Sequence, residues 1–237
     1  MIRYLADIGL LTPRTTIAHG VWLTRDEIAI MAEHRAGVVH NPISNLKLKS
    51  GVAPMHAAMQ AGVRVALGCD NCSCGDCQSI FQAMKMFCLL AAVGDANPTG
   101  VRAVDAVKAA TLGGAQAMNL EGEIGAVRPG MKADLVIIDL NDVAWQPLNS
   151  VARQLVFSEA GRSVETTIVN GEIVMFERRI ATIDEAALRE ELVSLMPTFR
   201  RDFANVAEAN RQAIPYLLAA NERLKSHDVG INRFVAL

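Results

Sequence analysis

The sequence lacks the features that would direct it to a membrane, to the cell exterior or to nucleic acid. No apolar run reaches the roughly 18 residues that suggest a membrane span. The apolar character of the first residues breaks at Arg3, too early for a signal peptide. A formal net charge of −2 without a basic tract gives no electrostatic reason to expect nucleic acid. We therefore expect a cytoplasmic protein that binds neither membranes nor nucleic acid.

Nor does the sequence indicate a disulfide framework. Its five cysteines are an odd number in a chain without a predicted signal peptide, which favours reduced thiols. Hydrophobic residues make up 51% of the chain and charged residues 20%, the composition of an ordinary globular protein and not of a disordered one. A chain of 237 residues can bury a substantial core in one large or two modest domains.

Over residues 1 to about 95, the sequence alternates short apolar runs with helical patterns. This alternation is typical of βα units and predicts an α/β fold with a parallel sheet. A capping box of Thr24 and Glu27 predicts the start of a helix that we expect Gly37 to end, and residues 42–51 are predicted to be a polar loop. The pattern gives three βα units, whereas an eight-stranded barrel needs about 250 residues.

The later residues predict a small β domain followed by helices. Residues 97–120 have a helical pattern punctuated at Gly113 and Gly114, and a short strand is predicted at 135–139. Asn170 and Gly171 predict a hairpin between 166–169 and 172–176. The chain is again helical after Asp184, with a predicted break at Pro197. A mostly apolar stripe suited to docking follows: Phe199, Phe203, Val206, Asn210, Ile214 and Leu217.

Three successive predicted strands end in polar side chains that can bind a metal. These are His19, His40 and Asp70, each at the carboxyl end of a short apolar run. Barrels of parallel strands place their chemistry at that end. The three strand ends therefore predict a metal-assisted hydrolytic site.

The motifs around these residues resemble the amidohydrolase superfamily. The sequences AHGVWL at 18–23, HNPISNLKL at 40–48 and LGCD at 67–70 are similar to its branch of cytosine, guanine and adenosylhomocysteine deaminases and triazine chlorohydrolases. Residues 122–136 resemble the family's segment that leads back into its small β-sandwich domain. The motifs occur in the family's order across residues 4 to about 176.

The resemblance implies the C-terminal part of a (β/α)₈ TIM barrel. In the family, a His-x-His pair after the first strand, a His after the fifth and an Asp after the eighth bind a divalent metal. By motif context, His19 matches the sixth-strand His, His40 lies on the seventh strand and Asp70 matches the eighth-strand Asp. No His-x-His pair occurs, and no His-x-x-Glu precedes His19. We therefore expect Met1 to begin after the fifth strand, with barrel strands six to eight in residues 1–120, part of the β-sandwich in 121–182 and a helical segment in 183–237.

The resemblance also implies a reaction for the full-length parent. That protein would hydrolyse a C–N bond of an N-heterocycle, deaminating an amino-purine, pyrimidine, pterin or triazine ring with one zinc or iron ion. Asp70 would ligate the metal and take the proton of the bound water, and His19 would donate a hydrogen bond to the water or to the tetrahedral centre. We expect the present chain alone to be inactive and to bind no catalytic metal tightly, because one carboxylate cannot replace three or four ligands.

Each of these residues also has a simpler structural interpretation. A strand-end carboxylate such as Asp70 commonly caps the following helix, although its motif context favours the functional role. His40, Trp22 and Asn71 are predicted to contact the substrate. However, a single aromatic is more often a packing residue, and His40 could equally brace the loop that follows it.

Four cysteines follow one another closely beside Asp70, at 69, 72, 74 and 77. Their spacing could in principle hold zinc or an iron–sulfur cluster. They leave little chain to wrap a tetrahedral ion, so we favour a cysteine-rich active-site loop. Two alternative functions stay open: a metal-binding module built on these cysteines, and a non-catalytic fragment whose exposed barrel edge pairs with another chain. An open sheet edge also leads us to expect a homo-oligomer.

Overall fold

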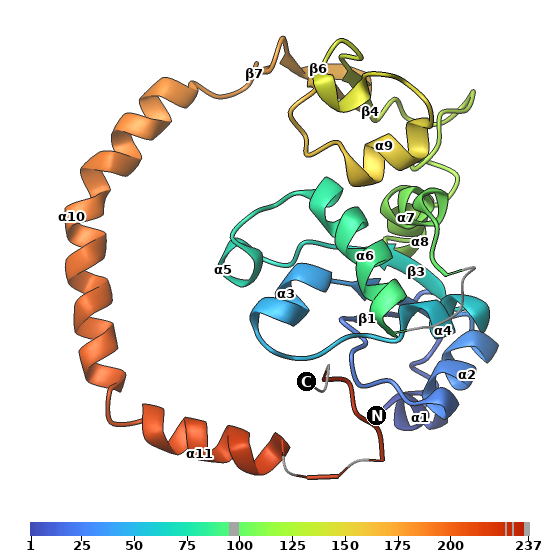
Figure 1. The fold of residues 1–237 in the computed structure, drawn as a ribbon, viewed down its shortest axis with the longest axis vertical. Helices are drawn as coiled ribbons and strands as arrows, with labels where there is room; N and C mark the ends of the chain where they lie inside the picture. The colour runs from blue at the N-terminus through green and yellow to red at the C-terminus, as the bar shows by residue number, and fades with distance from the viewer. Residues whose placement is uncertain (95–99, 226, 229, 235–237) are drawn as a thin grey trace.

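The computed structural model describes residues 1–94, 100–225, 227–228 and 230–234 (Figure 1). Its first half contains a parallel sheet of β1 (Thr16–Ala18), β2 (Gly37–His40) and β3 (Arg64–Leu67), in chain order. In the register of this sheet, Ile17 lies opposite Val38, and Val38 lies opposite Val65. The predicted α/β class with a parallel sheet is confirmed.

Helices precede and follow each of these strands. They are α1 (Ile2–Asp7), α2 (Arg25–Glu33), α3 (Pro42–Lys47), α4 (Met55–Gln60), α5 (Cys72–Gly75) and α6 (Ile80–Gly94). The predicted capping box is confirmed, because the Thr24 hydroxyl accepts from the Glu27 amide at 3.2 Å while the Glu27 carboxylate accepts from the Thr24 amide at 3.2 Å. These two bonds satisfy amides that the first turn of a helix leaves unpaired.

Two predicted boundaries in this half are wrong. Helix α2 ends at Glu33, and Arg35 takes the left-handed conformation with φ of 53°, whereas Gly37 already opens β2. The predicted polar loop at 42–51 contains α3, with Pro42 in its first turn. Proline suits that position because the amide it lacks has no helical partner there. Two of the polar residues that suggested a loop, Ser44 and Asn45, are buried.

The core lies between the sheet and the helices that cover it. Ile2, Met31, Val38 and Phe87 are each at most 1% exposed and belong to one apolar cluster. Helices α7 (Ala103–Ala110) and α8 (Leu112–Ala117) also pack against β3. The predicted break at Gly113 and Gly114 is wrong, because the chain turns at Thr111, and residues 97–99 of that predicted helix lie outside the described residues. Gly113 has a packing role, since a Cβ there would overlap the Val65 carbonyl.

A second, antiparallel sheet consists of β4 (Leu135–Ile138), β5 (Val164–Val169), β6 (Glu172–Phe176) and β7 (Arg179–Ile180). The predicted hairpin is confirmed, with Asn170 and Gly171 at φ of 50° and 86° between β5 and β6. The short helices η1 (Val143–Trp145) and α9 (Val151–Phe157) connect β4 to β5.

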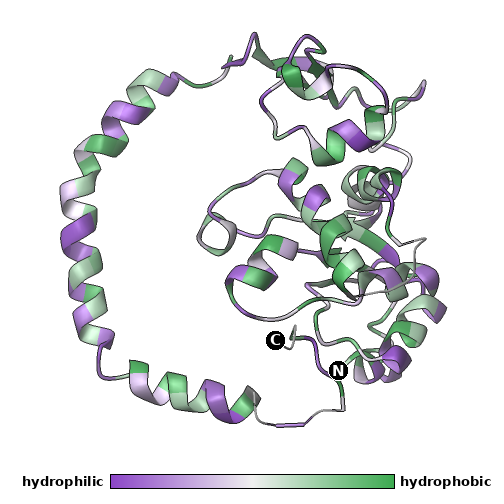
Figure 2. Ribbon diagram, in the orientation of Figure 1, coloured by the Kyte–Doolittle hydropathy of each residue, from purple (hydrophilic) through white to green (hydrophobic). Residues whose placement is uncertain are grey.

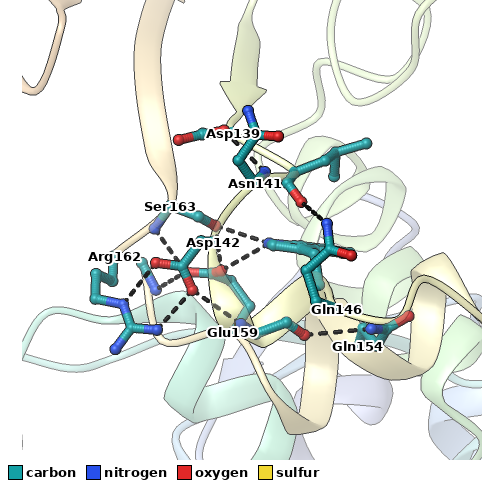
Figure 3. A network of polar contacts seen from close by, with 12 residues as sticks. Asp139, Asn141, Asp142, Gln146, Gln154, Glu159, Arg162 and Ser163 are labelled. Atoms are coloured by element: carbon teal, nitrogen blue, oxygen red, sulfur yellow. Dashed lines mark hydrogen bonds and ion pairs between the residues drawn. The ribbon is translucent and has the colours of Figure 1, made fainter.

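A buried carboxylate anchors this connection (Figure 3). Glu159 is 4% exposed and accepts hydrogen bonds from Trp145 Nε1 at 3.1 Å, from the Gly161 amide at 2.6 Å and from the Ser163 hydroxyl. Burial raises the pKa of Glu159, but the bonds from Ser163, Gly161 and Trp145 outweigh that effect and hold the pKa below its ordinary value. These bonds join Trp145 of η1 and the turn after α9 to Ser163, directly before β5.

Two long helices, α10 (Glu185–Asn210) and α11 (Ile214–Lys225), arc away from the rest of the molecule (Figure 1). Green apolar residues recur along both of them (Figure 2), and no residue of α10 is buried. The predicted break at Pro197 is wrong, because α10 continues through it. Proline removes one backbone hydrogen bond, and the bonds of the other turns keep this helix continuous. Among the described residues, no helix is both long and apolar enough to cross a membrane.

After α11 the chain returns to the parallel sheet. The Arg233 carbonyl accepts from the Val52 amide at 2.7 Å, and the Arg233 guanidinium donates to the Leu23 carbonyl at 2.5 Å. The rings of Phe234 and Trp22 meet edge to face, with centroids 5.3 Å apart. The last described residues therefore lie against the loops that follow β1 and α3.

Candidate functional site

His19 and Asp70 come together at the carboxyl ends of β1 and β3. His19 Nε2 lies 3.8 Å from Asp70 Oδ2. Both residues have left-handed backbones, with φ of 67° and 61°. Such a conformation is uncommon for a residue with a side chain and is often found at functional sites. Of the three strand-end residues from which a site was predicted, His19 and Asp70 therefore lie close together.

Asp70 is held as a carboxylate by hydrogen bonds. Its Oδ2 accepts from the Ser44 hydroxyl at 2.6 Å, and its Oδ1 accepts from the Asn71 amide at 2.8 Å. The Ser44 hydroxyl is the largest influence that lowers the pKa of Asp70, followed by the Asn71 amide. The charge of His19 and the Cys74 thiol lower it further, against desolvation. Because the Asp70 side chain keeps 22% of its surface exposed, the ionised group remains accessible.

Asn45 supports His19 from the opposite side of the ring. His19 Nδ1 lies 2.8 Å from Asn45 Oδ1, and the His19 side chain is 42% exposed. Asn45 is adjacent to Ser44 on α3, so one short helix supplies the partners of both His19 and Asp70. Sequence reasoning missed Ser44 and Asn45 because it placed them in a loop.

A pocket of about 500 Å³ opens beside β1 and includes these four residues in its lining. Apolar side chains form much of the remaining wall, among them Ile2, Ile17, Val21, Trp22 and Leu48. A carboxylate and an imidazole in an apolar-walled pocket are suited to proton transfer.

The third strand-end residue, His40, lies apart from this pocket. It is 2% exposed and packs against Phe87, with ring centroids 5.8 Å apart. Burial, followed by the charge of His19, lowers the pKa of His40 to about 4, against a hydrogen bond with the His19 backbone that raises it. His40 is therefore neutral at pH 7, and its predicted contact with substrate stays a prediction.

The other two residues predicted to bind substrate differ in position. Trp22 lines the pocket and donates from Nε1 to the Ser50 carbonyl at 3.1 Å. Asn71 caps α5, because its Oδ1 accepts from the amides of Ser73 at 3.0 Å and Cys74 at 3.1 Å. The capping role considered for Asp70 thus belongs to Asn71, which leaves the Asp70 carboxylate to the pocket.

The cysteine-rich loop does not form a metal centre in this arrangement. Cys69 and Cys74 are partly buried, while Cys72 and Cys77 are exposed, and all are free thiols. Over the described part of the chain, no group of three or more His, Cys, Asp or Glu side chains could hold a metal ion. Asp70 is one carboxylate with an imidazole beside it, so the residues present do not by themselves fit a zinc or iron ion.

The chain thus has a parallel sheet whose strand ends bring a histidine and an aspartate together. Residues 2–174 match the model of the amidohydrolase family, and the chain belongs to that family. The predicted resemblance is thereby confirmed. The chain is 39% identical over 190 residues to a 5'-deoxyadenosine deaminase of Methanosarcina mazei, covering 80% of this chain and 44% of the relative. It is 41% identical over 189 residues to a 5-methylthioadenosine/S-adenosylhomocysteine deaminase of Moorella thermoacetica, with the same two shares covered.

Solved structures show the same fold. A zinc-bound adenosine deaminase from Xanthomonas campestris superposes with a TM-score of 0.81 at 33% identity, covering 84% of this chain and 46% of that one. The zinc complex of the atrazine chlorohydrolase TrzN from Arthrobacter aurescens gives a TM-score of 0.76 at 22% identity, covering 82% of this chain and 43% of that one, a likeness of fold alone. The chain thus spans less than half the length of the relatives that it matches.

Proposed function

We propose that the full-length protein hydrolyses the exocyclic C–N bond of an amino-substituted N-heterocycle, and that the ring is the adenine of an adenosine derivative. The observation that carries this proposal is the contact of His19 with a hydrogen-bonded Asp70 carboxylate at the strand ends. Identities of 39% and 41% to enzymes named as deaminases of adenosine derivatives support the choice of substrate.

In this reaction the oxygen of a water molecule bonds to the ring carbon. The proton that the water loses passes to Asp70, which its lowered pKa keeps in the unprotonated form. As this bond forms, the electron pair of the attacked ring C=N bond moves to the ring nitrogen. Asp70 then passes its proton to the amino nitrogen, the electron pair re-forms the ring C=N bond, and the exocyclic C–N bond breaks with release of ammonia. His19 Nε2 forms a hydrogen bond with the oxygen that attacks the ring carbon.

We assign Asp70 as the one metal ligand that this chain contributes. The remaining ligands belong, in this proposal, to the part of the relatives that the chain does not match. We likewise propose that β1, β2 and β3 are the last three strands of a (β/α)₈ barrel, with 121–182 contributing to a β-sandwich domain and 183–237 forming a separate helical segment. A divalent ion in such a site activates water for attack.

Ammonia release from 5'-deoxyadenosine tests the function. The chain is co-expressed with the part of the Methanosarcina mazei relative that precedes the matched segment, and the purified pair is assayed with zinc. We expect deamination that Asp70→Asn reduces at least about a thousandfold, as expected for loss of a group that acts in the transition state.

The matched control is Asp76→Asn, which removes an exposed carboxylate paired with Lys47 at 2.5 Å. We expect it to leave the rate within about twofold, because an exposed ion pair contributes little. A zinc-loaded pair that deaminates no amino-heterocycle, or that works equally well with Asp70→Asn, would contradict the proposal.

A further inference from the structure

We propose that Ser44 and Asn45 are positioning residues that fix which atoms of Asp70 and His19 face the pocket. Ser44 holds Oδ2 of the Asp70 carboxylate, and Asn45 holds His19 in the form that carries its proton on Nδ1. The catalytic meaning of this arrangement rests on the proposed function.

The two residues reach partners on different strands from adjacent positions in one helix. Ser44 Oγ donates to Asp70 Oδ2 at 2.6 Å, and Asn45 Oδ1 lies 2.8 Å from His19 Nδ1. Each partner is 26 residues away in the sequence, in opposite directions. Because a single turn of α3 joins the two contacts, it fixes the position of His19 relative to Asp70.

This turn of α3 is rigidly held. Ser44 is 1% exposed and Asn45 is 2% exposed. The Asn45 amide donates to the Asn41 carbonyl at 3.0 Å, and the Asn45 carbonyl accepts from the Ser50 amide at 2.8 Å. Asn41 in turn lies so close to Gly68 that a Cβ on Gly68 would overlap its side chain. Residues locked in this way by packing and backbone bonds can hold a reacting group in one geometry.

The bond to Asn45 has a consequence for the chemistry of His19. A neutral imidazole has one nitrogen that donates and one that accepts, and a side-chain amide oxygen only accepts. In the arrangement that we propose, Asn45 Oδ1 is the acceptor and Nδ1 carries the proton, so the lone pair of Nε2 in the neutral ring faces Asp70 and the pocket. Neutral His19 accepts a hydrogen bond or a proton at Nε2, and it donates there only after it has been protonated. This differs from the donor role expected from the sequence.

Asn45 makes this contact at some cost. Its Nδ2 is buried and has no hydrogen-bond partner among the described residues. An unpaired buried donor is destabilising. An apolar residue would fill this position without that cost, so the presence of an amide favours a role for its oxygen in the contact with His19. Within the described part of the chain, the one hydrogen bond of the Asn45 side chain is the bond to His19.

Nitrogen NMR of the intact chain tests the inference without any activity. Histidine is labelled with ¹⁵N, the His19 signals are assigned with His19→Gln, and shifts are read at alkaline pH, where the ring is neutral. We expect a protonated Nδ1 and an unprotonated Nε2. In Asn45→Ala the population should move toward the form protonated on Nε2, whereas Asn45→Asp should restore protonation on Nδ1.

Ser44→Ala is the matched control, because it removes the neighbouring contact and should leave the His19 tautomer unchanged. Its own effect is measured in a crystal structure, where the Asp70 carboxylate should turn away from His19, and Ser44→Thr should keep it in place. A native His19 protonated on Nε2 would overturn the role of Asn45 without any variant. An Asp70 carboxylate that stays in place in Ser44→Ala would overturn the role of Ser44. Failure of the deamination assay would leave these readouts unaffected, so the two proposals fail separately.

Discussion

The parallel-sheet body (residues 1–117) and the helical arm (α10 and α11) differ in how they bury their apolar residues. In the body, Phe87 is 1% exposed, whereas Phe203 on α10 is 65% exposed. The residues that form the pocket around His19 and Asp70 all come from the body. The comparison shows that the buried core and the site belong to the same region of the molecule. Among the described residues, nothing packs over the apolar stripe of the arm.

The largest expected effect comes from truncating a phenylalanine in each region. Phe87→Ala should lower the free energy of unfolding by about 3–5 kcal/mol, because it leaves a cavity in the core. Phe203→Ala should change it by less than about 0.5 kcal/mol, since it touches no core residue. Urea unfolding followed by circular dichroism measures both values. Equal losses in the two variants would show that the arm is packed as firmly as the body.

The second effect is a pH dependence of the free energy of unfolding, which we expect from a buried histidine of the body. Burial lowers the pKa of His40 from 6.5 to about 4. Below pH 6.5 the unfolded chain takes up a proton that the folded chain accepts only near pH 4, so stability falls as the pH falls through this window. The loss amounts to about 3 kcal/mol at about 1.4 kcal/mol per pKa unit.

His40→Gln isolates this contribution. The unfolding free energy is measured at pH 7 and pH 4, and the variant should lose less stability between them than the native chain does. His227→Gln, at an exposed histidine beyond α11, serves as the control and should follow the native curve. Parallel curves for all three proteins would mean that His40 is not kept neutral by its burial.

A smaller effect distinguishes the helix caps of the two regions. Thr24→Ala removes the cap of α2 and should cost about 1 kcal/mol of unfolding free energy. Asp184 caps α10 by accepting from the amides of Ala186 and Ala187, each at 3.0 Å. Asp184→Ala should reduce the helix content while leaving the main unfolding transition in place, because α10 buries none of its residues. A shared loss of stability would show that the arm unfolds together with the body.

The smallest effect on the folded chain is expected from polar changes in the stripe of the arm. Phe199→Ser with Phe203→Ser should leave the unfolding midpoint unchanged and weaken self-association measured by sedimentation. The predicted homo-oligomer and the exposed rings of these residues motivate this expectation. If the native chain sediments as a monomer at all concentrations, the stripe does not mediate contact between copies.

The predictable part of the fold is the part that local sequence specifies. Thr24 and Glu27 predict the start of a helix through bonds made within four residues. The apolar runs before His19 and Asp70 predict parallel strands. The sequence alone also places a carboxylate and an imidazole at strand ends. Their approach to 3.8 Å depends on the tertiary structure, because β2 lies between β1 and β3.

The supporting residues were not predictable in the same way. Ser44 and Asn45 have side chains that are common in loops. Their burial depends on bonds to partners 26 residues away in the sequence, which the local sequence does not reveal. Pro42 in the first turn was a local signal for α3 that the polar sequence obscured. The role of His40 also depends on tertiary burial. Sequence shows its place after a strand, but its packing against Phe87 removes it from the pocket surface.

Zinc content tests the central claim that this chain carries one metal ligand and the acid–base pair of a larger site. The chain is dialysed against micromolar zinc, alone and together with the complementary segment of the Methanosarcina mazei relative, and the bound metal is measured by mass spectrometry. We predict negligible zinc on the chain alone and about one ion per complemented pair, lost in Asp70→Asn, as expected for a site that needs three or four ligands. Stoichiometric zinc on the chain alone, unaffected by Asp70→Asn, would contradict the account.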